Sequence, residues 1–455
     1  MMMPTTHTRP RGPRGVAMVM VLVAVLILTL VLLEFSKTSR THLNQGVNVR
    51  DTVRANVIAE TGMVLTRACL DPSIWGPMAG QMAKMDMQKV CNLLLGVFLA
   101  GRVDLPVGGL SVELEGIDNL GIGKGGLEEM ELVPEESFIG LAGMYCPNNQ
   151  QTGAPDLNCT SRIQTAGKLR SILCDPDIAH VFENEQEDGK RYTRWDIITN
   201  IADWMDRDDN RMQFDPLTGQ FIQGAGEGED SYYGDSDDRY RAKDAPLDSI
   251  EELRLIRGIN DDLFNFLKDR VSVHAREKVN VQTASRDIFE ALLRANAPAF
   301  QVIENNSCGE ETSGTPQDQM DQALTMYADL IVKARDDYAF QRMMSGNFFG
   351  NTFRNNQDFL RIAQDPLASL MNGQMAQFNP AMMQQYLALS QDPTYAILRG
   401  QVINWQQLAQ GVTVRVAERM FRLNIKARVG NISRRVMAVL KQDGPVVRTL
   451  YYRED

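Results

Sequence analysis

The chain has 455 residues, enough for two or three domains, and its 44% hydrophobic and 23% charged residues are typical of a folded protein. Its formal net charge is −11, and removal of residues 1–15 with their three arginines would bring it to −14 (−11 − 3). Phosphate contacts need clustered lysine and arginine. The composition therefore argues against nucleic acid as a partner and is compatible with calcium or with basic protein surfaces.

An apolar segment near the N-terminus is the first predicted element. Residues 16–33 contain no charge, are long enough to cross a bilayer as a helix, and directly follow a leader with three arginines. No A-x-A cleavage site follows this segment, and a glycine, Gly15, closes the leader instead. This arrangement resembles a type IV pilin-like leader, which a prepilin peptidase cuts between Gly15 and Val16. An uncleaved signal anchor is the alternative.

The fifth residue after this cleavage point is Met20. Pilins and major pseudopilins usually carry a glutamate there, which pairs with the N-terminal amine of the subunit ahead in the filament. A buried charge needs such a partner. A subunit at the filament tip has no neighbour ahead and needs no such glutamate, so Met20 fits a tip position.

The pattern of apolar residues predicts one helix from residue 16 to about residue 67, about 75 Å long at 1.5 Å per residue. Residues 82–98 look helical. Residues 105–145 read as strands, with candidates at 110–115 and 137–144 and a glycine-rich turn at 121–126. A loop at 147–160 separates them from the next region.

The region 165–300 reads as helices, at 168–173, 195–204, 250–257, 261–267 and 285–295. Ser249 and Glu252 form a candidate capping box for the third of them, and Gly258 ends it. Residues 303–400 contain a Met-, Gln- and Asn-rich stretch that reads as an amphipathic insertion or a mobile segment. The last forty residues predict antiparallel strands at 421–429, 432–441 and 446–452.

The six cysteines allow fifteen full pairings, and no pair has the C-x-x-C spacing of a zinc or redox site. Cys146 and Cys159 flank a loop rich in Pro, Asn and Gly, and we predict that they pair with each other. Free buried thiols are the alternative.

Several motifs occur in a fixed order. They are DWMDRDDN at 203–210, EDSYYGDSDDRY at 229–240, APLDSIEELRLIRGI at 245–259 and VNVQTAS at 279–285. Their order resembles the type II secretion minor pseudopilin K (GspK) family, and the segment VIAETGMVLTRA at 57–68 resembles a stretch found in many minor pilins and pseudopilins. The stretch 303–400 looks longer than the family needs.

The resemblance implies an α+β fold, in which a pilin-like long N-terminal helix packs on an antiparallel sheet and a large α-helical domain is inserted. The expected segments are a cleaved leader at 1–15, the long helix at 16–67, the first part of the α/β scaffold at 68–164, the inserted helical domain at 165–300, a variable insertion at 301–410 and the C-terminal strands at 411–455.

The family resemblance also implies a function. It is that of a minor pseudopilin at the tip of the type II secretion pseudopilus, a structural component in the export of folded proteins. The implied partners are minor pseudopilins I and J, further pseudopilins, prepilin peptidase and, at the tip, the secretin or exoproteins. The implied location is the inner membrane of a Gram-negative bacterium, with one span and a periplasmic globular part.

Acidic residues between 203 and 238 are the candidate site. Asp206, Asp208 and Asn210 repeat the start of an EF-hand loop, but Arg211 replaces the required Gly and Leu217 replaces the bidentate Glu. Calcium still needs only six to eight oxygens on a flexible loop, and the family is known to bind it. The candidate calcium ligands are Asp203, Asp206, Asp208, Glu229, Asp230 and Asp235. A solvated acidic loop is the alternative.

Two other functional classes fit the sequence less well. Residues 250–295 look like the helix-hairpin-helix units of DNA-uptake proteins, so a minor pilin or DNA-uptake protein of a type IV pilus-like system is the alternative function. However, Asp261 and Asp262 follow the candidate hairpin and would repel phosphate. No catalytic motif is present, and the four histidines are scattered along the chain, so we predict that the chain is not an enzyme.

Overall fold

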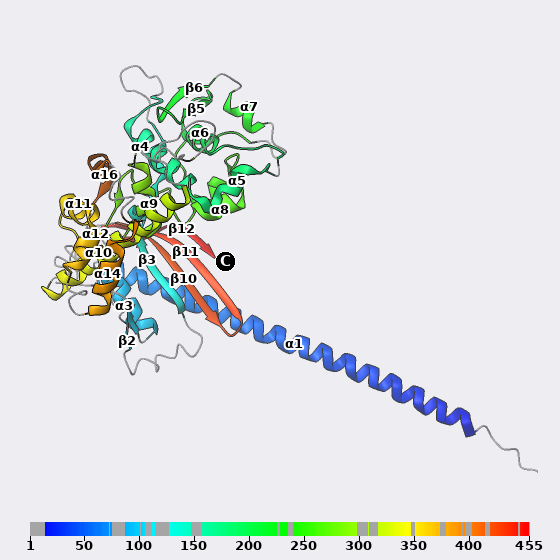
Figure 1. The fold of residues 1–455 in the computed structure, drawn as a ribbon. Helices are drawn as coiled ribbons and strands as arrows, with labels where there is room; N and C mark the ends of the chain where they lie inside the picture. The colour runs from blue at the N-terminus through cyan, green and yellow to red at the C-terminus, as the bar shows by residue number, and fades with distance from the viewer. Residues whose placement is uncertain are drawn as a thin grey trace, which may run out of the picture.

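The computed structural model describes residues 14–71, 73–74, 87–100, 102–104, 111–113, 127–146, 156–186, 188–224, 228–234, 240–297, 308, 317–346, 351–373, 379–393, 395, 403–414, 419–444 and 446–454. Figure 1 shows one long helix that leads into a sheet, and a large, mostly helical head at the end of the sheet away from the N-terminus.

The long helix is α1 (Arg14–Leu70). Its 57 residues correspond to about 85 Å at 1.5 Å per residue, so the predicted helix is confirmed and continues to Leu70. The large apolar side chains between Met18 and Leu33 are each at least 50% exposed, and this part of the helix is long and apolar enough to cross a membrane. The Thr29 hydroxyl donates to the carbonyl of Val25 at 2.8 Å, which satisfies the one polar side chain of the segment.

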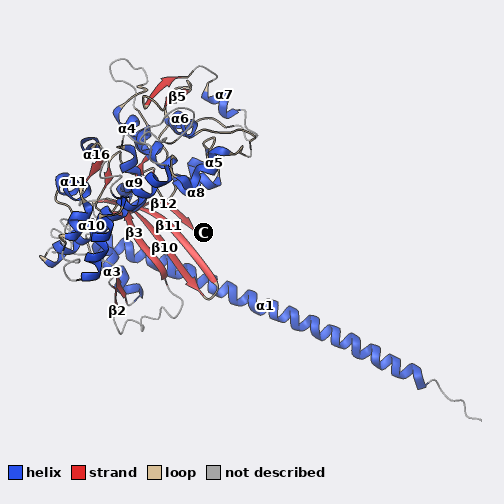
Figure 2. Cartoon of the chain, in the orientation of Figure 1, coloured by secondary structure: helices blue, strands red, loops and turns tan. Residues whose placement is uncertain are grey.

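The second part of α1 packs on a four-stranded antiparallel sheet (Figure 2). The strands, in spatial order, are β12 (Val446–Glu454), β11 (Ile432–Asp443), β10 (Met420–Val429) and β3 (Leu127–Pro134). The three C-terminal strands confirm the sequence prediction, and Gly430 (φ +60°) and Gly444 (φ +62°) occupy the two turns between them. Ala59 and Leu70 of α1 share one apolar core with alternate residues of β10.

A disulfide between Cys69 and Cys91 joins the end of α1 to α3 (Met87–Ala100). The predicted helix at 82–98 is therefore found, except that residues 82–86 lie outside the described residues. The predicted strand at 110–115 is found as β2 (Ser111–Glu113), which pairs with β1 (Arg102–Asp104), and the predicted glycine-rich turn at 121–126 also lies outside.

The strand predicted at 137–144 is wrong. The chain there forms a 3-10 turn, η3 (Glu135–Ser137), then the two-residue strand β4 (Ile139–Gly140) and a second 3-10 turn, η4 (Leu141–Met144). A Cβ at Gly140 would lie 2.1 Å from the carbonyl oxygen of Arg276, so the backbones approach closely at this point. Tertiary packing has overridden the alternating pattern here.

The inserted domain begins after the disulfide between Cys146 and Cys159, which confirms the predicted pairing. Every helix predicted between residues 165 and 300 is present, and a hairpin of β5 and β6 was not predicted. The elements are α4 (Thr160–Leu173), η5 (Pro176–Ile178), α5 (Ala179–Glu183), α6 (Arg194–Met205), β5 (Met212–Asp215), β6 (Gln220–Gln223), α7 (Glu229–Gly234), η6 (Ile250–Leu255), α8 (Asp261–Leu267), β7 (Val271–Ser272), β8 (Val279–Asn280) and α9 (Arg286–Ala295).

The described residues between 317 and 414 are also mostly helical. They form α10 (Gln317–Met344), α11 (Asn356–Gln364), α12 (Pro366–Met371), α14 (Pro380–Ser390), α16 (Trp405–Gly411) and the short strand β9 (Val412–Thr413). Their apolar residues belong to the same buried cluster as those of α4, α6 and α9. A third disulfide, between Cys174 and Cys308, adds a covalent link within the head.

A buried ion pair joins the head to the sheet. The guanidinium of Arg422, on β10, donates to both carboxylate oxygens of Glu135, at 2.9 and 3.2 Å. It also donates to the carbonyls of Lys268 (2.7 Å) and Val271 (3.0 Å), and it lies 4.0 Å from the ring centroid of Phe138. Because Arg422 is 5% exposed and Glu135 is 0% exposed, this contact forms part of the interior.

Candidate metal centre

The helix α6 brings two of the predicted carboxylates together. It begins at a capping box, in which the Thr193 hydroxyl accepts from the backbone N–H of Asp196 and the Asp196 carboxylate accepts from that of Thr193. Asp203 lies in its last turn and Asp206 is its C-cap. Carboxylates are unfavourable at the negative end of a helix dipole. Something positive must therefore stabilise this pair when both are ionised.

A third carboxylate, Glu229, comes from the start of α7. The residue before Glu229 is Gly228, and only a glycine fits there. A Cβ at this position would lie 2.6 Å from Asp209 Oδ2 and 2.9 Å from the Asp209 carbonyl oxygen. The backbone N–H of Glu229 donates to that same carbonyl at 3.3 Å. Gly228 thus lets α7 approach the chain that leaves α6.

Asp203, Asp206 and Glu229 form a compact triad. Each offers a carboxylate oxygen within 4.8 Å of the other two, and the three residues are 2%, 3% and 1% exposed. The rings of Trp204 and Tyr233 lie with their centroids 5.2 Å apart, and both residues are buried in the main core. The low exposure of all three residues means that the triad is shielded from solvent.

The triad leaves many buried oxygens without a hydrogen bond. Asp203 Oδ1 accepts from the backbone N–H of Met212 at 3.1 Å. Among the described residues, no hydrogen bond reaches Asp203 Oδ2, either carboxylate oxygen of Asp206, either of Glu229, or Oδ2 of the neighbouring Asp208. Buried polar groups normally have hydrogen-bond partners, and a bound ion would account for these unsatisfied oxygens.

Two arginines lie near the triad but do not replace the missing partners. Arg162 Nη2 is 3.8 Å from Asp206 Oδ2, and Arg211 Nε is 3.7 Å from Asp203 Oδ2. Both separations are beyond normal hydrogen-bond length. The arginines therefore offset part of the negative charge and leave the carboxylate oxygens free to bind a cation.

Burial and mutual repulsion both disfavour the ionised carboxylates. Burial raises the pKa of Asp203 to about 7, against the hydrogen bond from Met212. Burial and then the charge of Asp203 raise the pKa values of Asp206 and Glu229. A divalent cation would reverse this balance, because it favours the charged form of every carboxylate around it.

The residues present fit calcium. Calcium prefers carboxylate oxygens at 2.3–2.6 Å and accepts irregular geometry. Three buried carboxylates with unsatisfied oxygens, and no sulfur or imidazole ligand among them, match that preference. Asp203, Asp206 and Glu229 would hold the ion, which would supply positive charge that fixes the end of α6 against α7.

The other predicted ligands have different positions. Asp208 is partly buried, and its charge acts on both Asp206 and Glu229. The side chain of Asp230 and the whole of Asp235 lie outside the described residues. For all six residues, calcium ligation stays a prediction.

Sequence reasoning missed two residues near the triad, Asp244 and Arg162. Asp244 has a φ of +55°, which is uncommon for a residue other than glycine, and its charge acts on Asp206 and Glu229. Its place just before the recognised motif at 245–259 was the available signal. Arg162 had no such signal, because it lies far along the chain from the acidic residues that it faces.

The predicted processing residues Gly15 and Val16 lie in the first turn of α1. Their position in a helix neither requires nor forbids cleavage between them, so the cleavage stays a prediction.

Comparisons with known proteins point to one family. Residues 185–276 match the family model described as type II secretion system (T2SS), protein K. Among solved structures, a chain of the crystal structure of the GspK–GspI–GspJ complex from the enterotoxigenic Escherichia coli type 2 secretion system is 14% identical. That match covers 73% of this chain and 84% of the other, with a TM-score of 0.36. No curated protein matches the chain.

The matched segment contains α6, the three carboxylates of the triad and the capped helix η6. It also covers most of the motifs whose order distinguishes the sequence. Over residues 185–276 the chain therefore resembles the type II secretion system protein K family.

Proposed function

We propose that the chain is a minor pseudopilin at the tip of a type II secretion pseudopilus and takes part in export of folded proteins from the periplasm. The observation that carries this proposal is the division of α1. Its first part exposes an uninterrupted apolar surface, whereas its second part packs one face on the sheet. The first part is thus available to a bilayer or to the helices of neighbouring subunits.

The tip position is supported by bulk and by charge. The inserted domain and the helices after residue 316 form a head at the far end of the sheet (Figure 1). A head of this size repeated along a filament would collide with the subunits around it. The absence of a glutamate at Met20 removes the group that would pair with a subunit ahead.

The proposed maturation begins with cleavage by a prepilin peptidase between Gly15 and Val16. The mature chain would keep α1 as a single inner-membrane span, with the globular part in the periplasm. Minor pseudopilins I and J, and further pseudopilins, would pack against α1. In the solved Escherichia coli complex, GspK is assembled with GspI and GspJ, and we propose the same two partners for this chain, which matches the protein K family model over residues 185–276. The secretin or the exoproteins would meet the head.

Calcium is proposed as a structural ion of the head. It would bind Asp203, Asp206 and Glu229 and hold α6 to α7. We expect calcium to raise the midpoint of thermal unfolding of the wild-type chain relative to the chain in EGTA, because a ligand that binds only the native state stabilises it by about 2.7 kcal/mol at one hundred times its Kd. The double variant Asp206→Asn with Glu229→Gln should not respond. Asp262→Asn, at an exposed carboxylate of the same domain, is the matched control.

The export role is tested by deletion and complementation. Loss of the gene should leave exoproteins in the periplasm, and unaltered export would contradict the proposal. In the complemented strain, Gly15→Leu should block both cleavage and export, whereas Gly46→Ala, at an open position on α1, should leave both intact. Peptide mass spectrometry of the membrane fraction should find a mature N-terminus at Val16. A wild-type chain that retains Gly15 would overturn the pseudopilin assignment.

A further inference from the structure

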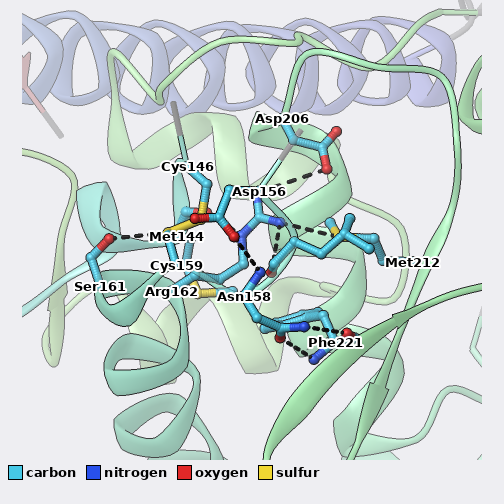
Figure 3. Close-up of a disulfide and its surroundings, with 11 residues drawn as sticks. Met144, Cys146, Asp156, Asn158, Cys159, Ser161, Arg162, Asp206, Met212 and Phe221 are labelled. Atoms are coloured by element: carbon cyan, nitrogen blue, oxygen red, sulfur yellow. Dashed lines mark hydrogen bonds and ion pairs between the residues drawn. A yellow bond between two sulfur atoms is a disulfide. The ribbon is translucent and has the colours of Figure 1, made fainter. Parts of the chain in front are cut away.

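Figure 3 shows the disulfide between Cys146 and Cys159 together with Arg162 and with Asp206, one carboxylate of the triad. The Cα atoms of the two cysteines are 6.0 Å apart, and Cys159 is the N-cap of α4. Met144 lies two residues before the first cysteine and Leu157 lies two residues before the second. The disulfide therefore fixes the carbonyl groups of these two residues relative to each other.

Both carbonyls hold one buried arginine. Arg162, on the first turn of α4, donates from Nε to the Met144 carbonyl at 2.8 Å and from Nη1 to the Leu157 carbonyl at 3.4 Å. Its Nη1 also donates to Met212 Sδ at 3.1 Å. The side chain is 1% exposed, and its remaining nitrogen, Nη2, faces Asp206 Oδ2 at 3.8 Å. The disulfide thus positions the buried guanidinium of Arg162 relative to the Asp206 carboxylate of the triad.

A second set of contacts leads from the disulfide to Asp203. Asn158, next to Cys159, donates from Nδ2 to the Phe221 carbonyl at 2.8 Å, and its Oδ1 accepts from the Phe221 backbone N–H at 2.7 Å. Phe221 belongs to β6, which pairs with β5. The first residue of β5, Met212, donates its backbone N–H to Asp203 Oδ1 at 3.1 Å. The hairpin that holds Asp203 is therefore tied to the disulfide loop.

We propose that the Cys146–Cys159 disulfide positions the carboxylate triad for a divalent cation, with Arg162 and Asn158 as the positioning residues. This inference rests on the proposed calcium site. When the disulfide is open, the Met144 and Leu157 carbonyls separate, Arg162 and the β5–β6 hairpin lose their anchor, and Asp206 and Asp203 no longer converge. Groups that orient metal ligands are typically worth 10–100-fold in metal affinity.

The coupling is reciprocal, because a bond that strengthens cation binding is itself protected by the bound cation. Calcium is therefore expected to shift the equilibrium between dithiol and disulfide at Cys146–Cys159 towards the disulfide. It has no such effect on Cys69–Cys91, which lies in the separate core between α1 and the sheet. The two disulfides of one molecule thus provide a test case and its control.

The first experiment measures calcium affinity by isothermal titration calorimetry on the full-length protein in detergent. The double variant Cys146→Ser with Cys159→Ser should bind calcium at least tenfold more weakly than wild type. The matched double variant Cys69→Ser with Cys91→Ser should bind as wild type does. Equal affinities in the two double variants would overturn the coupling and leave the calcium site intact. No calcium binding by the wild-type chain would overturn both.

The second experiment needs no variant, so it decides the question even where the double variant fails to fold. Wild-type protein is brought to equilibrium with mixtures of reduced and oxidised dithiothreitol, with and without calcium, and the reduced cysteines are alkylated and quantified by mass spectrometry. We expect calcium to raise the ratio of reduced to oxidised dithiothreitol that half-reduces Cys146–Cys159 at least several-fold, with little change at Cys69–Cys91. Equal midpoint ratios for Cys146–Cys159 in both conditions would overturn the proposal. Asn158→Ala, which removes one set of contacts and keeps the disulfide, should reduce the protection.

Discussion

The ion pair between Arg422 and Glu135 offers a sharp test of how the head is held on the sheet. Replacement of Arg422 by methionine keeps an unbranched apolar side chain against Phe138 but removes four hydrogen bonds. The Glu135 carboxylate is then buried with no partner at its former position. Removal of one partner of a buried pair generally costs about 3–5 kcal/mol, and the two carbonyls that lose a donor add to this.

The reverse replacement, Glu135→Leu, should be less costly. Arg422 then keeps its hydrogen bonds to the carbonyls of Lys268 and Val271, so its charge retains two of its acceptors. The double variant should be more stable than Arg422→Met alone, because no uncompensated charge stays buried. The difference between the sum of the single effects and the double effect measures the coupling, which we expect to be about 2–3 kcal/mol for contacting groups.

The assay is urea unfolding of the full-length protein, followed by tryptophan fluorescence and by near-ultraviolet circular dichroism. A second measurement, hydrogen exchange of the residues around Val271, reports whether the head has loosened at this contact. The matched control is Arg428→Met, at an exposed ion pair on the same strand, which should change stability by less than about 1 kcal/mol. If Arg422→Met costs no more than this control, the reasoning about the buried pair is wrong.

Three further predictions concern the head. In EGTA, the free energy of unfolding should fall as pH rises from about 4 to 8. The folded state holds a proton on Asp203 up to a pKa of about 7, whereas the unfolded chain releases it near 3.8. Thermal unfolding at several pH values checks this, and added calcium should abolish the trend. Gly228→Ala should weaken calcium binding, measured by calorimetry, because its Cβ would meet the carbonyl oxygen of Asp209. Gly258→Ala should lower the midpoint of thermal unfolding, because φ is +84° there and a Cβ would meet the ring of Tyr192.

The parts of the fold that the sequence predicts are those formed by local contacts. A continuous apolar run with no proline predicts α1, and alternating residues separated by Gly430-Asn431 and Asp443-Gly444 predict the C-terminal strands. The partner of β10 on its other side is β3, which lies almost three hundred residues away. No local pattern encodes such a pairing, because it depends on which edges remain after the whole chain has packed.

The candidate metal centre also has a part that the sequence predicts and a part that it does not. The sequence predicts that carboxylates gather between residues 203 and 238, because the residue types and their number can be read directly from it. It does not predict which of them meet, because that depends on where α6 ends and on the close approach that Gly228 permits. The same limit applies to 137–144, where Glu135 is drawn into the interior by Arg422 and the expected strand gives way to 3-10 turns.

The contacts from α1 to the head form one continuous path. Cys69 bonds α1 to α3, and the Asn92 side chain of α3 donates to the Leu132 carbonyl and accepts from its N–H, on β3. β3 pairs with β10, whose Arg422 reaches the head. At the opposite edge of the sheet, Tyr451 of β12 donates to Glu251 of the head at 3.2 Å. Because each step is a covalent bond, a strand pairing or a hydrogen-bonded contact, a displacement of α1 along its axis is transmitted through the sheet to the head. The proposed tip subunit, pushed at its membrane helix and acting at its head, would require this kind of coupling.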